Sequence, residues 1–419
     1  MPLFYFQTFG CQMNVADSEQ IKKKLMMRGF RPSLSFDQAD IIIVNTCSVR
    51  ENAEKRAMVK IGEFAKSKKE NASLWVIGCM AERLGDKLKG IIPEIDLVIG
   101  AKRIDEIDSI IEKHLPGCVC SKLPETESNV TDFVPVMRGC NNYCTYCIVP
   151  YVRGPEHSIP AGEIENVIRE KVTNGVKEIT LLGQNVNSYN DHGTDFPDLL
   201  YKIAGINGLE RIRFTTSHPK DCNEKLIRAI AEIPKMSRHV HLPVQAGSDK
   251  ILKMMNRKYG RFQYLELVDM IKKYLPDADI TTDIMVGFPG ETDDDFRETL
   301  QLVRQVRYTT AFMFAYSVRE GTEAASMVDS VPKEIKISRL NELISLQTSI
   351  TKEIYSNVVG KECEVLITGQ QKKRDRFWMG QDKGCKKLLV SCNSIKAGMI
   401  LKVRAVRSSG MTLICERIV

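Results

Sequence analysis

The sequence predicts an α/β protein of several domains: two parallel α/β domains followed by a small all-β barrel. The chain has 419 residues, more than one hydrophobic core usually supports, so two or three domains are expected. Short apolar β-branched runs alternate with helical stretches over most of its length, which is typical of parallel sheets. After Gly360 the pattern changes to short β-like runs separated by glycines, which favours a small β-barrel.

Composition agrees with a globular fold, since hydrophobic residues make up 43% and charged residues 27% of the chain. We place the domain boundaries where the pattern changes. They give an N-terminal domain at 1–115, a linker at 116–133, a central domain at 134–355 and a C-terminal domain at 356–419.

The N-terminal domain is expected to be a Rossmann-like parallel sheet with crossover helices. Strands are predicted at 3–9, 40–45, 74–77 and 95–99, and helices at 17–27, 50–69 and 104–113. Cys11, Cys47 and Cys79 each come at or just after the end of one of the first three strands. Because parallel strands share one carboxyl edge, these cysteines should converge there. The simpler alternative is three unrelated core cysteines, since cysteine is often buried.

The central domain repeats the alternation and predicts a parallel α/β barrel, open or closed. Strands are expected at 178–182, 211–215, 239–242, 279–286 and 309–314, and helices at 161–174, 223–231, 292–306 and 333–355. In such barrels the chemistry lies at the carboxyl ends of the strands. Polar residues gather at those positions: Gln184, Asn185, Ser217, His218, Gln245 and Asp283.

Three cysteines at the start of the central domain form a compact ligand motif. Cys140, Cys144 and Cys147 are spaced C-x3-C-x2-C, and the next cysteine in the sequence is Cys222. Structural zinc and most iron–sulfur cubanes take four protein ligands. Three cysteines therefore leave one iron open for another ligand, although a structural metal loop is the alternative.

This motif resembles the signature of the radical S-adenosylmethionine (SAM) enzymes, and Tyr146 matches the aromatic residue before their last cluster cysteine. The resemblance implies a [4Fe-4S] cluster on Cys140, Cys144 and Cys147. Its open iron binds the amino and carboxylate groups of SAM, and an electron then cleaves SAM to a 5′-deoxyadenosyl radical. The resemblance also implies a partial (β/α)6 TIM-like barrel for the central domain.

The segments 8–14, 45–51 and 77–81 resemble the three motifs of the radical SAM methylthiotransferases. The resemblance implies a second, auxiliary [4Fe-4S] cluster on Cys11, Cys47 and Cys79, which donates sulfur. Together with 182–188, these segments most resemble the branch that modifies isopentenylated adenosine in tRNA. The same resemblance implies SAM contacts from polar residues after successive strands: Gln184, Asn185, Ser217, Gln245, Asp283, Gly287 and Glu291.

Two of these assignments have alternatives. The segment Leu182-Gly-Gln184 departs from the commoner Gly-Gly-Glu form of the family's amine-binding motif. The glycine-rich segment 286–291 also fits a permissive loop before a helix, with Glu291 near the helix N-terminus. Arg257 and Arg319 are candidates for contacts to the cofactor carboxylate or to RNA phosphate, although an isolated arginine is more often an ordinary surface residue. We treat His157, His218, His239 and His241 as structural.

Nearly all excess positive charge lies in the C-terminal domain. The chain carries a net charge of +7, whereas residues 361–419 alone carry +8. This basic module is identified as similar to the TRAM domain, an RNA-binding barrel, with strands expected at 362–368, 387–391, 399–406 and 411–418. The candidate RNA contacts combine cations with aromatic rings: Lys372, Lys373, Arg374, Arg376, Phe377 and Trp378. A solvated lysine-rich surface and an aromatic pair buried in the barrel core are the alternatives.

The expected activity is methylthiolation of carbon 2 of isopentenyladenosine at tRNA position 37, with two SAM molecules. Threonylcarbamoyl-adenosine and a ribosomal-protein aspartate are the alternative acceptors, and a non-catalytic iron–sulfur regulator is the alternative class. The sequence shows neither a signal peptide nor a membrane span, so we expect a cytoplasmic protein with reduced thiols. The expected partners of a monomer are the tRNA anticodon stem-loop and a low-potential electron donor such as flavodoxin or ferredoxin.

Overall fold

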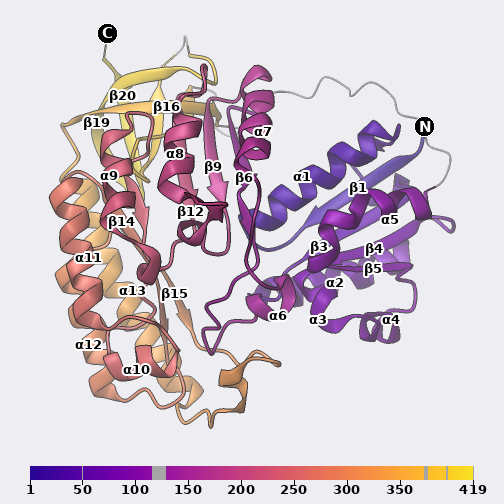
Figure 1. Cartoon of the computed structure of the whole chain (residues 1–419), viewed down its shortest axis with the longest axis horizontal. Coiled ribbons are helices and arrows are strands. Elements are labelled where there is room, and N and C mark those ends of the chain that lie inside the picture. The colour runs from indigo at the N-terminus through magenta and orange to yellow at the C-terminus, as the bar shows by residue number, and fades with distance from the viewer. Residues whose placement is uncertain (50, 116–128, 372–375, 393–394, 419) are drawn as a thin grey trace. The chain divides into compact units, whose positions relative to one another are not determined.

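The computed structural model describes all residues except 50, 116–128, 372–375, 393–394 and 419. The chain forms two compact units, coloured along the sequence in Figure 1. The first unit comprises 1–127, 138–143 and 147–157, and the second comprises 128–137, 144–146 and 158–419. The C-x3-C-x2-C segment contributes to both, since Cys140 and Cys147 belong to the first unit and Cys144 to the second.

The first unit contains a five-stranded parallel sheet in the order β2-β1-β3-β4-β5. The strands are β1 (Leu3–Thr8), β2 (Arg31–Pro32), β3 (Ile41–Thr46), β4 (Ser73–Gly78) and β5 (Leu97–Gly100). Every residue of β3 is buried, as expected for a central strand covered on both faces. The predicted Rossmann-like sheet is confirmed, and β2 is an additional short edge strand.

The first unit contains six α-helices among the described residues. They are α1 (Gln12–Met27), α2 (Glu51–Ser67), α3 (Cys79–Leu84), α4 (Lys87–Ile91), α5 (Ile107–His114) and α6 (Val149–Arg153). Of these, α1, α2 and α5 correspond to the three predicted helices. Helix α1 begins five residues earlier than expected, because Cys11 is its extended N-cap residue directly after the turn at Gly10. Val152 of α6 and Ile148, just before the helix, pack with Cys79 and Ala101 in a small apolar cluster.

The second unit contains six parallel strands in two three-stranded sheets, ordered β6-β9-β12 and β13-β14-β15. The strands are β6 (Thr131–Pro135), β9 (Glu178–Leu182), β12 (Arg211–Thr215), β13 (His239–His241), β14 (Asp279–Val286) and β15 (Thr310–Ala315). A backbone bridge joins Ile212 of β12 to Met236, three residues before β13 begins. This is the partial six-stranded barrel that the resemblance implied, although β6 begins inside the predicted linker.

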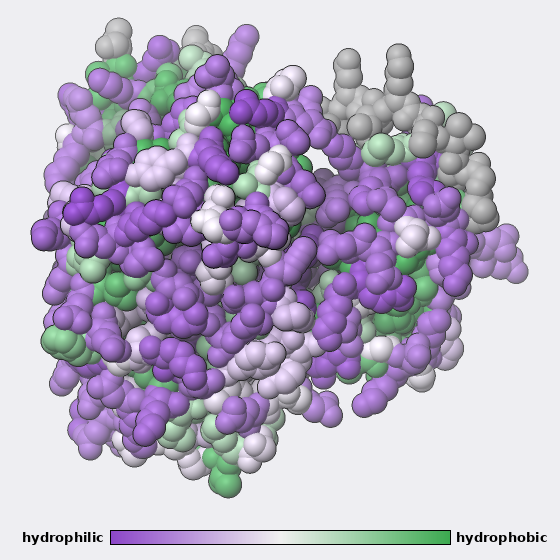
Figure 2. All heavy atoms as spheres, viewed as in Figure 1, coloured by the Kyte–Doolittle hydropathy of each residue, from purple (hydrophilic) through white to green (hydrophobic). Residues whose placement is uncertain are grey.

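Helices follow the strands in the order that parallel connections require. They are α7 (Ala161–Thr173), α8 (Phe196–Ala204), α9 (Glu224–Glu232), α10 (Asp249–Met254), α11 (Arg261–Tyr274), α12 (Asp293–Val306) and α13 (Lys333–Ser356). The visible surface over α9, α11 and α12 is mainly hydrophilic in Figure 2. Short strands β7 (Met137–Arg138), β8 (His157–Ser158), β10 (Asn190–Asp191) and β11 (Thr194–Asp195) complete the set before the C-terminal barrel. No helix in the described part of the chain has an apolar stretch long enough to cross a membrane.

The C-terminal strands close into a barrel in the order β16-β17-β18-β20-β19. They are β16 (Glu362–Gln370), β17 (Phe377–Gln381), β18 (Lys387–Ser391), β19 (Ile400–Ser409) and β20 (Thr412–Arg417). The predicted small barrel is confirmed, but the sequence did not predict β17. Gly380 permits β17 to approach β16 closely, because a Cβ there would lie 2.4 Å from Cγ2 of Val365.

The loop between β17 and β18 contacts the amino ends of the central strands. Arg211, the first residue of β12, donates to the backbone oxygens of Gln381 (2.8 Å) and Asp382 (3.0 Å). Lys386 pairs with Asp279, the first residue of β14. In Figure 1, β9 points away from the yellow C-terminal barrel, whose loop therefore lies opposite the carboxyl ends that carry the candidate site residues. The amino-end face of such barrels serves stability.

Candidate metal centre and cofactor site

The three N-terminal cysteines lie at the carboxyl edge of the first sheet. Cys11 follows the turn after β1, while Cys47 and Cys79 directly follow the last residues of β3 and β4. These three strands are adjacent and parallel. Cys47 and Cys79 are buried and Cys11 is half-buried, and the thiols of Cys47 and Cys11 lie within electrostatic range of Cys79. The fold therefore brings together three residues that are far apart in sequence.

Two glycines allow this close approach. Gly10 has φ +122°, and a Cβ there would lie 2.7 Å from Cβ and 3.2 Å from Sγ of Cys47. Gly78 has φ +97°, and a Cβ there would lie 2.4 Å from Oδ1 of Asn45. Side chains at either position would collide with the cysteine loops, so these backbone conformations require glycine.

A buried asparagine ties two of these loops together. The Asn14 amide nitrogen donates to the backbone oxygens of Phe9 and Thr46, both at 2.9 Å. These oxygens lie at the ends of β1 and β3, next to Cys11 and Cys47. Asn45 in turn donates to the backbone oxygen of Asn14 at 2.9 Å. Asn14 and Asn45 thus hold the cysteine-bearing loops at a set separation.

Arg153, which the sequence analysis did not select, also reaches this cysteine trio. Its Nη2 donates to Oδ1 of Asn14 (2.8 Å) and Oδ2 of Asp17 (3.2 Å), and the guanidinium also bonds the Cys79 thiol. Its side chain is 5% exposed. Burial alone would lower the pKa of Arg153, but the Asp17 carboxylate raises it, as do the Cys79 and Cys11 thiols when they ionise, so the arginine is cationic. Its position after the last cysteine of C-x3-C-x2-C, in Val-Arg-Gly, was the available signal.

Burial raises the pKa of the Cys79 thiol to about 12, with Cys47 and Cys11 adding to the rise and Arg153 opposing it. A thiol in this setting stays protonated until a metal displaces the proton. No three Cys, His, Asp or Glu side chains among the described residues converge on a single ion position. The thiolates of a cubane bind different irons, so a cluster does not require that convergence. Three thiols, a cation and sterically demanded glycines fit an anionic iron–sulfur cluster.

The cofactor residues predicted in the central domain lie at the carboxyl edge of the six strands. Gln184 and Asn185 follow β9, and Ser217 and His218 follow β12. One buried polar atom of each has no hydrogen-bond partner in the described structure: Gln184 Oε1, Asn185 Oδ1, Ser217 Oγ and His218 Nε2. Since buried polar atoms are nearly always paired, four such atoms on neighbouring strands fit a polar ligand such as SAM.

The environment of His218 explains why that histidine is neutral. Burial, and then the charges of Arg257 and Lys220, lower its pKa to about 2. Its Nδ1 accepts from the Lys220 backbone nitrogen at 3.3 Å. Because Nδ1 accepts, the single proton of the neutral ring lies on Nε2, so His218 can offer Nε2–H to a ligand without adding charge.

Gln245, in the segment after β13, lies beside Asp283 on β14. Gln245 has φ +73°. Its backbone nitrogen donates to the backbone oxygen of Asp283 (2.9 Å), and its backbone oxygen accepts from the backbone nitrogen of Met285 (2.8 Å). The Asp283 carboxylate lies 3.6 Å from Nε2 of His241. The backbone thus sets the relative positions of two predicted cofactor residues.

Gly287 and Glu291 form a loop that is held mainly by the protein itself. The Gly287 backbone nitrogen donates to Oε2 of Glu291 (2.6 Å), which also accepts from Arg339 (2.7 Å). Burial raises the pKa of Glu291, although Gly287 and Arg339 oppose the rise. Oε1 of Glu291 has no partner in the described structure, so this atom alone is available to a ligand.

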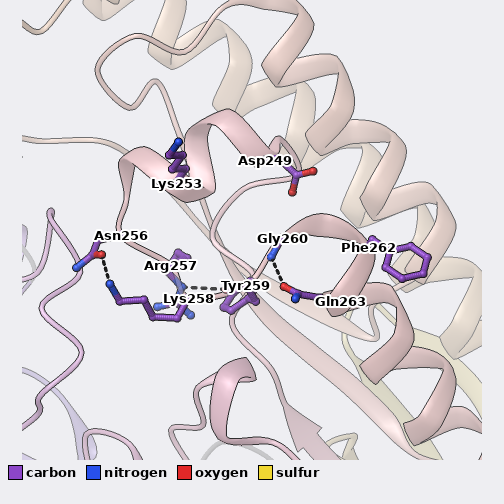
Figure 3. Close-up of a pocket in the computed structure, with 9 residues that line it drawn as sticks. All are labelled: Asp249, Lys253, Asn256, Arg257, Lys258, Tyr259, Gly260, Phe262 and Gln263. Atoms are coloured by element: carbon purple, nitrogen blue, oxygen red, sulfur yellow. Dashed lines mark hydrogen bonds between the residues drawn. The ribbon is translucent and has the colours of Figure 1, made fainter.

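Arg257 is a buried residue, which corrects our expectation of a surface arginine. Its Nη1 lies 3.3 Å from Sγ of Cys144 and 3.4 Å from Oη of Tyr146, and its Nε donates to Tyr259 (2.8 Å). Figure 3 shows it beside Tyr259 and Lys258 in the lining of an open hollow of about 560 Å³. A cation therefore lies against the second cysteine of the C-x3-C-x2-C motif.

The predicted RNA-binding residues are only partly described. Lys372, Lys373 and Arg374 lie outside the described residues. Arg376 is exposed, and Phe377 and Trp378 are half-buried on β17. Trp378 packs against the barrel core, whereas Phe377 does not belong to that cluster. Trp378 therefore fits the alternative of an aromatic ring packed in the barrel core, whereas Phe377 does not.

The chain is similar to known protein families and to several named proteins. Residues 134–303 match the model of the Radical SAM superfamily, and residues 3–100 match that of the Uncharacterized protein family UPF0004. A "tRNA-2-methylthio-N(6)-dimethylallyladenosine synthase" from Carboxydothermus hydrogenoformans is 45% identical over 96% of each chain. Proteins of the same name from Caldicellulosiruptor saccharolyticus (43%, covering 93% of this chain and 87% of the relative) and Clostridium botulinum (41%, covering 99% and 97%) are similar too.

Solved structures agree at the level of fold. The radical SAM methyltransferase TsrM from Kitasatospora setae superposes with a TM-score of 0.58 at 13% identity, over 78% of this chain and 77% of that one. The cobalamin-dependent SAM radical enzyme OxsB gives 0.52 at 11%, over 82% and 56%. With nearly full-length relatives above 40% identity and both cysteine trios in place, this chain belongs to the radical SAM methylthiotransferase family.

Proposed function

We propose that this chain is a tRNA-2-methylthio-N(6)-dimethylallyladenosine synthase, which adds a methylthio group to carbon 2 of isopentenyladenosine at tRNA position 37. The nearly full-length relatives with that name support the substrate. The observation that carries the proposal is the convergence of Cys11, Cys47 and Cys79 on one sheet edge, in a chain that also has the C-x3-C-x2-C motif.

The two trios have different roles in this proposal. Cys140, Cys144 and Cys147 hold one [4Fe-4S] cluster, and Cys11, Cys47 and Cys79 hold an auxiliary one. When bound, the first cluster with SAM supplies the radical chemistry that an unactivated aromatic C–H bond requires, and the second supplies sulfur. Arg257 holds a positive charge 3.3 Å from the sulfur of Cys144, one of the proposed ligands of the first cluster.

The central strands bind and orient SAM. Their unpartnered atoms offer complementary groups: Gln184 Oε1 and Asn185 Oδ1 accept hydrogen bonds, and the Ser217 hydroxyl can donate or accept. Asn185 is already oriented, because its amide nitrogen donates to Asp221 at 2.7 Å. Gln245, Asp283, Gly287 and Glu291 complete the proposed contact set.

The C-terminal barrel binds the tRNA. Its basic segment, Lys372, Lys373, Arg374 and Arg376, contacts phosphates, and Phe377 offers a ring for stacking. The target base has to leave its stack to reach the reaction site, which a splayed anticodon loop allows. A low-potential donor such as flavodoxin or ferredoxin, a monomeric state and a cytoplasmic location remain predictions.

An anaerobic assay with reconstituted protein, SAM and reductant tests this proposal. Three acceptors are compared: tRNA with isopentenyladenosine, tRNA with threonylcarbamoyl-adenosine, and the ribosomal-protein aspartate. Mass spectrometry of nucleosides and peptides should find the methylthio group on isopentenyladenosine alone. Product on another acceptor assigns the alternative branch, and no product with both clusters intact contradicts the methylthiolation itself.

Cysteine variants separate the two roles. Replacing Cys144 with alanine should abolish 5′-deoxyadenosine formation. Replacing Cys47 with alanine should abolish the methylthio product while 5′-deoxyadenosine is still released. If Cys47→Ala forms normal product, the auxiliary trio is not the sulfur donor.

A further inference from the structure

Arg153 carries a buried positive charge that the surrounding oxygens do not neutralise. Asp17 is the carboxylate closest to it, at 3.2 Å, and its side chain is 4% exposed. Arg138 takes the other oxygen of the same carboxylate at 2.7 Å. One buried carboxylate thus serves two guanidinium groups. The second partner of Arg138, Asp105, is 62% exposed, so among the buried groups a positive charge is left in excess.

The surplus charge lies on the side of the cysteine trio. Nη2 of Arg153 serves both Asn14 and Asp17, whereas Nε and Nη1 have no oxygen acceptor among the described residues. The guanidinium bonds the thiol of Cys79 and interacts electrostatically with Cys11. Arg138 differs in this respect, since it also reaches Asp105 on the surface, at 3.4 Å.

An unmatched buried charge is costly, so such groups are normally paired or face a metal site. The Cys11–Cys47–Cys79 trio is the adjacent group that can become anionic. We propose that Arg153 is a positioning residue of the auxiliary site, which places one positive charge against the sulfurs and thereby sets the reduction potential and the stability of the cluster held there. This inference rests on the proposed auxiliary cluster.

The chain position of Arg153 links the two cysteine trios. It ends α6, the short helix that starts two residues after Cys147. Val152, beside it, packs with Cys79 and Ala101. The segment that supplies a ligand to the radical cluster therefore also supplies the cation of the auxiliary site.

A purely structural role, as the partner of Asp17, is the competing explanation. Hydrogen bonds and charges near cluster sulfurs change reduction potentials, whereas a remote structural contact does not. A positive charge stabilises the reduced, more negative cluster. Its removal should lower the potential, and removal of the opposing Asp17 charge should raise it.

The experiment uses the full-length chain with Cys140, Cys144 and Cys147 replaced by alanine, so that one cluster is reconstituted. In this background we compare Arg153→Met, Arg153→Lys, Asp17→Asn and, as matched control, Arg138→Met. The midpoint potential is followed by EPR, and iron release to a chelator is timed. Thermal melting of the iron-free proteins shows which variants keep the fold.

Arg153→Met should shift the potential to more negative values and weaken the hold on iron, by at least about 10-fold in affinity, so that the chelator removes iron faster. Arg153→Lys keeps the positive charge, so the midpoint potential of the cluster in that variant should stay nearer to that of the parent protein. Asp17→Asn should shift the potential in the positive direction. Arg138→Met should have the smallest effect, because an exposed carboxylate already matches part of its charge.

The outcomes separate this inference from the proposed function. A parent protein without iron contradicts the auxiliary cluster itself. A parent with iron, whose potential is unchanged in Arg153→Met, overturns the role of Arg153 alone. If Arg153→Met fails to fold or to hold iron, the Asp17→Asn shift decides, and a negative or absent shift rejects the inference.

Discussion

The ammonium group of Lys386, in the loop of the C-terminal barrel, lies 2.6 Å from Oδ2 of Asp279 at the start of β14. Both residues are buried, and Asp279 also accepts from the Cys385 backbone nitrogen at 2.8 Å and from the Thr309 hydroxyl at 2.9 Å. The C-terminal barrel is therefore joined to the amino ends of the central strands through charged contacts.

Replacing Lys386 with methionine should destabilise the second unit. The change leaves the Asp279 carboxylate buried without its cation, and breaking a buried pair in this way costs about 3–5 kcal/mol. Urea unfolding at neutral pH measures the loss. Lys387→Met is the matched control: its side chain is exposed, so its effect should stay within about 0.5 kcal/mol. Equal losses in both variants would show that the buried pair is unimportant.

Asp382 should make stability depend on pH between about 4 and 6. Burial, with Asp279 adding and Lys386 opposing, raises its pKa from 3.8 to about 6. The folded chain therefore holds this proton more tightly than the unfolded chain does. Protonation of Asp382 thus contributes to the free energy of unfolding in full below about pH 4, and this contribution is lost as pH rises through about 6.

Asp382→Asn removes the ionisation but keeps an acceptor for the Lys386 backbone nitrogen. The variant should be more stable than the parent at pH 7, by about 1–3 kcal/mol, with little difference at pH 4. Urea midpoints measured across this range test the prediction. A parent and variant that keep the same difference at both pH values would contradict it.

Ser217→Ala should weaken SAM binding without destabilising the unliganded protein. The buried hydroxyl has no partner in the described structure, so its removal costs the free protein nothing, whereas a lost ligand hydrogen bond costs about 1 kcal/mol. Equilibrium dialysis should show about fivefold lower affinity. Thr351→Val is the control with opposite behaviour, because its hydroxyl donates to the Thr309 backbone oxygen at 3.0 Å. That variant should lose stability and keep its affinity for SAM.

Gly78→Ala should prevent assembly of the auxiliary site. The residue has φ +97°, and a Cβ would meet Asn45 Oδ1 at 2.4 Å and the Thr46 backbone oxygen at 2.5 Å. Strain of this kind costs about 1–3 kcal/mol, before the displacement of Cys47 and Cys79 is counted. Iron content after reconstitution and a melting curve measure both effects.

Gly62→Ala on α2 is the control for glycine replacement in the same unit. A Cβ there meets no atom within 4 Å, so alanine should stabilise the helix by about 0.5–1 kcal/mol and leave iron content unchanged. Normal iron content in Gly78→Ala would contradict the steric argument.

Replacing Phe377 should weaken tRNA binding, whereas replacing Trp378 should lower the stability of the barrel. Trp378 packs on the barrel core, so Trp378→Ala should lower stability by about 2–3 kcal/mol. Phe377→Ala should change stability little and weaken tRNA binding about tenfold, the loss expected for one stacked base. Fluorescence titration with tRNA at fixed salt, alongside urea unfolding, distinguishes the two. The reverse assignment of the two losses would contradict it.

Local patterns predicted most of the fold. The strands at 178–182, 211–215, 279–286 and 387–391 have the bounds that the sequence analysis assigned. Strand β17 was missed because its aromatic residues and Gly380 indicated a binding loop as readily as a strand. Arg257 was misjudged because an isolated arginine is usually exposed, and its burial depends on Tyr259 and Cys144 around it.

The sequence alone determined most strands and helices, the C-x3-C-x2-C trio and the family, because periodicity and ligand spacing are local properties of the chain. It indicated the second trio through the cysteine that follows each of the first three predicted strands. The tertiary structure decided where buried charges meet. Arg153 and Asp17 are 136 residues apart, and Lys386 and Asp279 are 107 apart. No local pattern records such pairs, since their contact exists only when folding removes both partners from water.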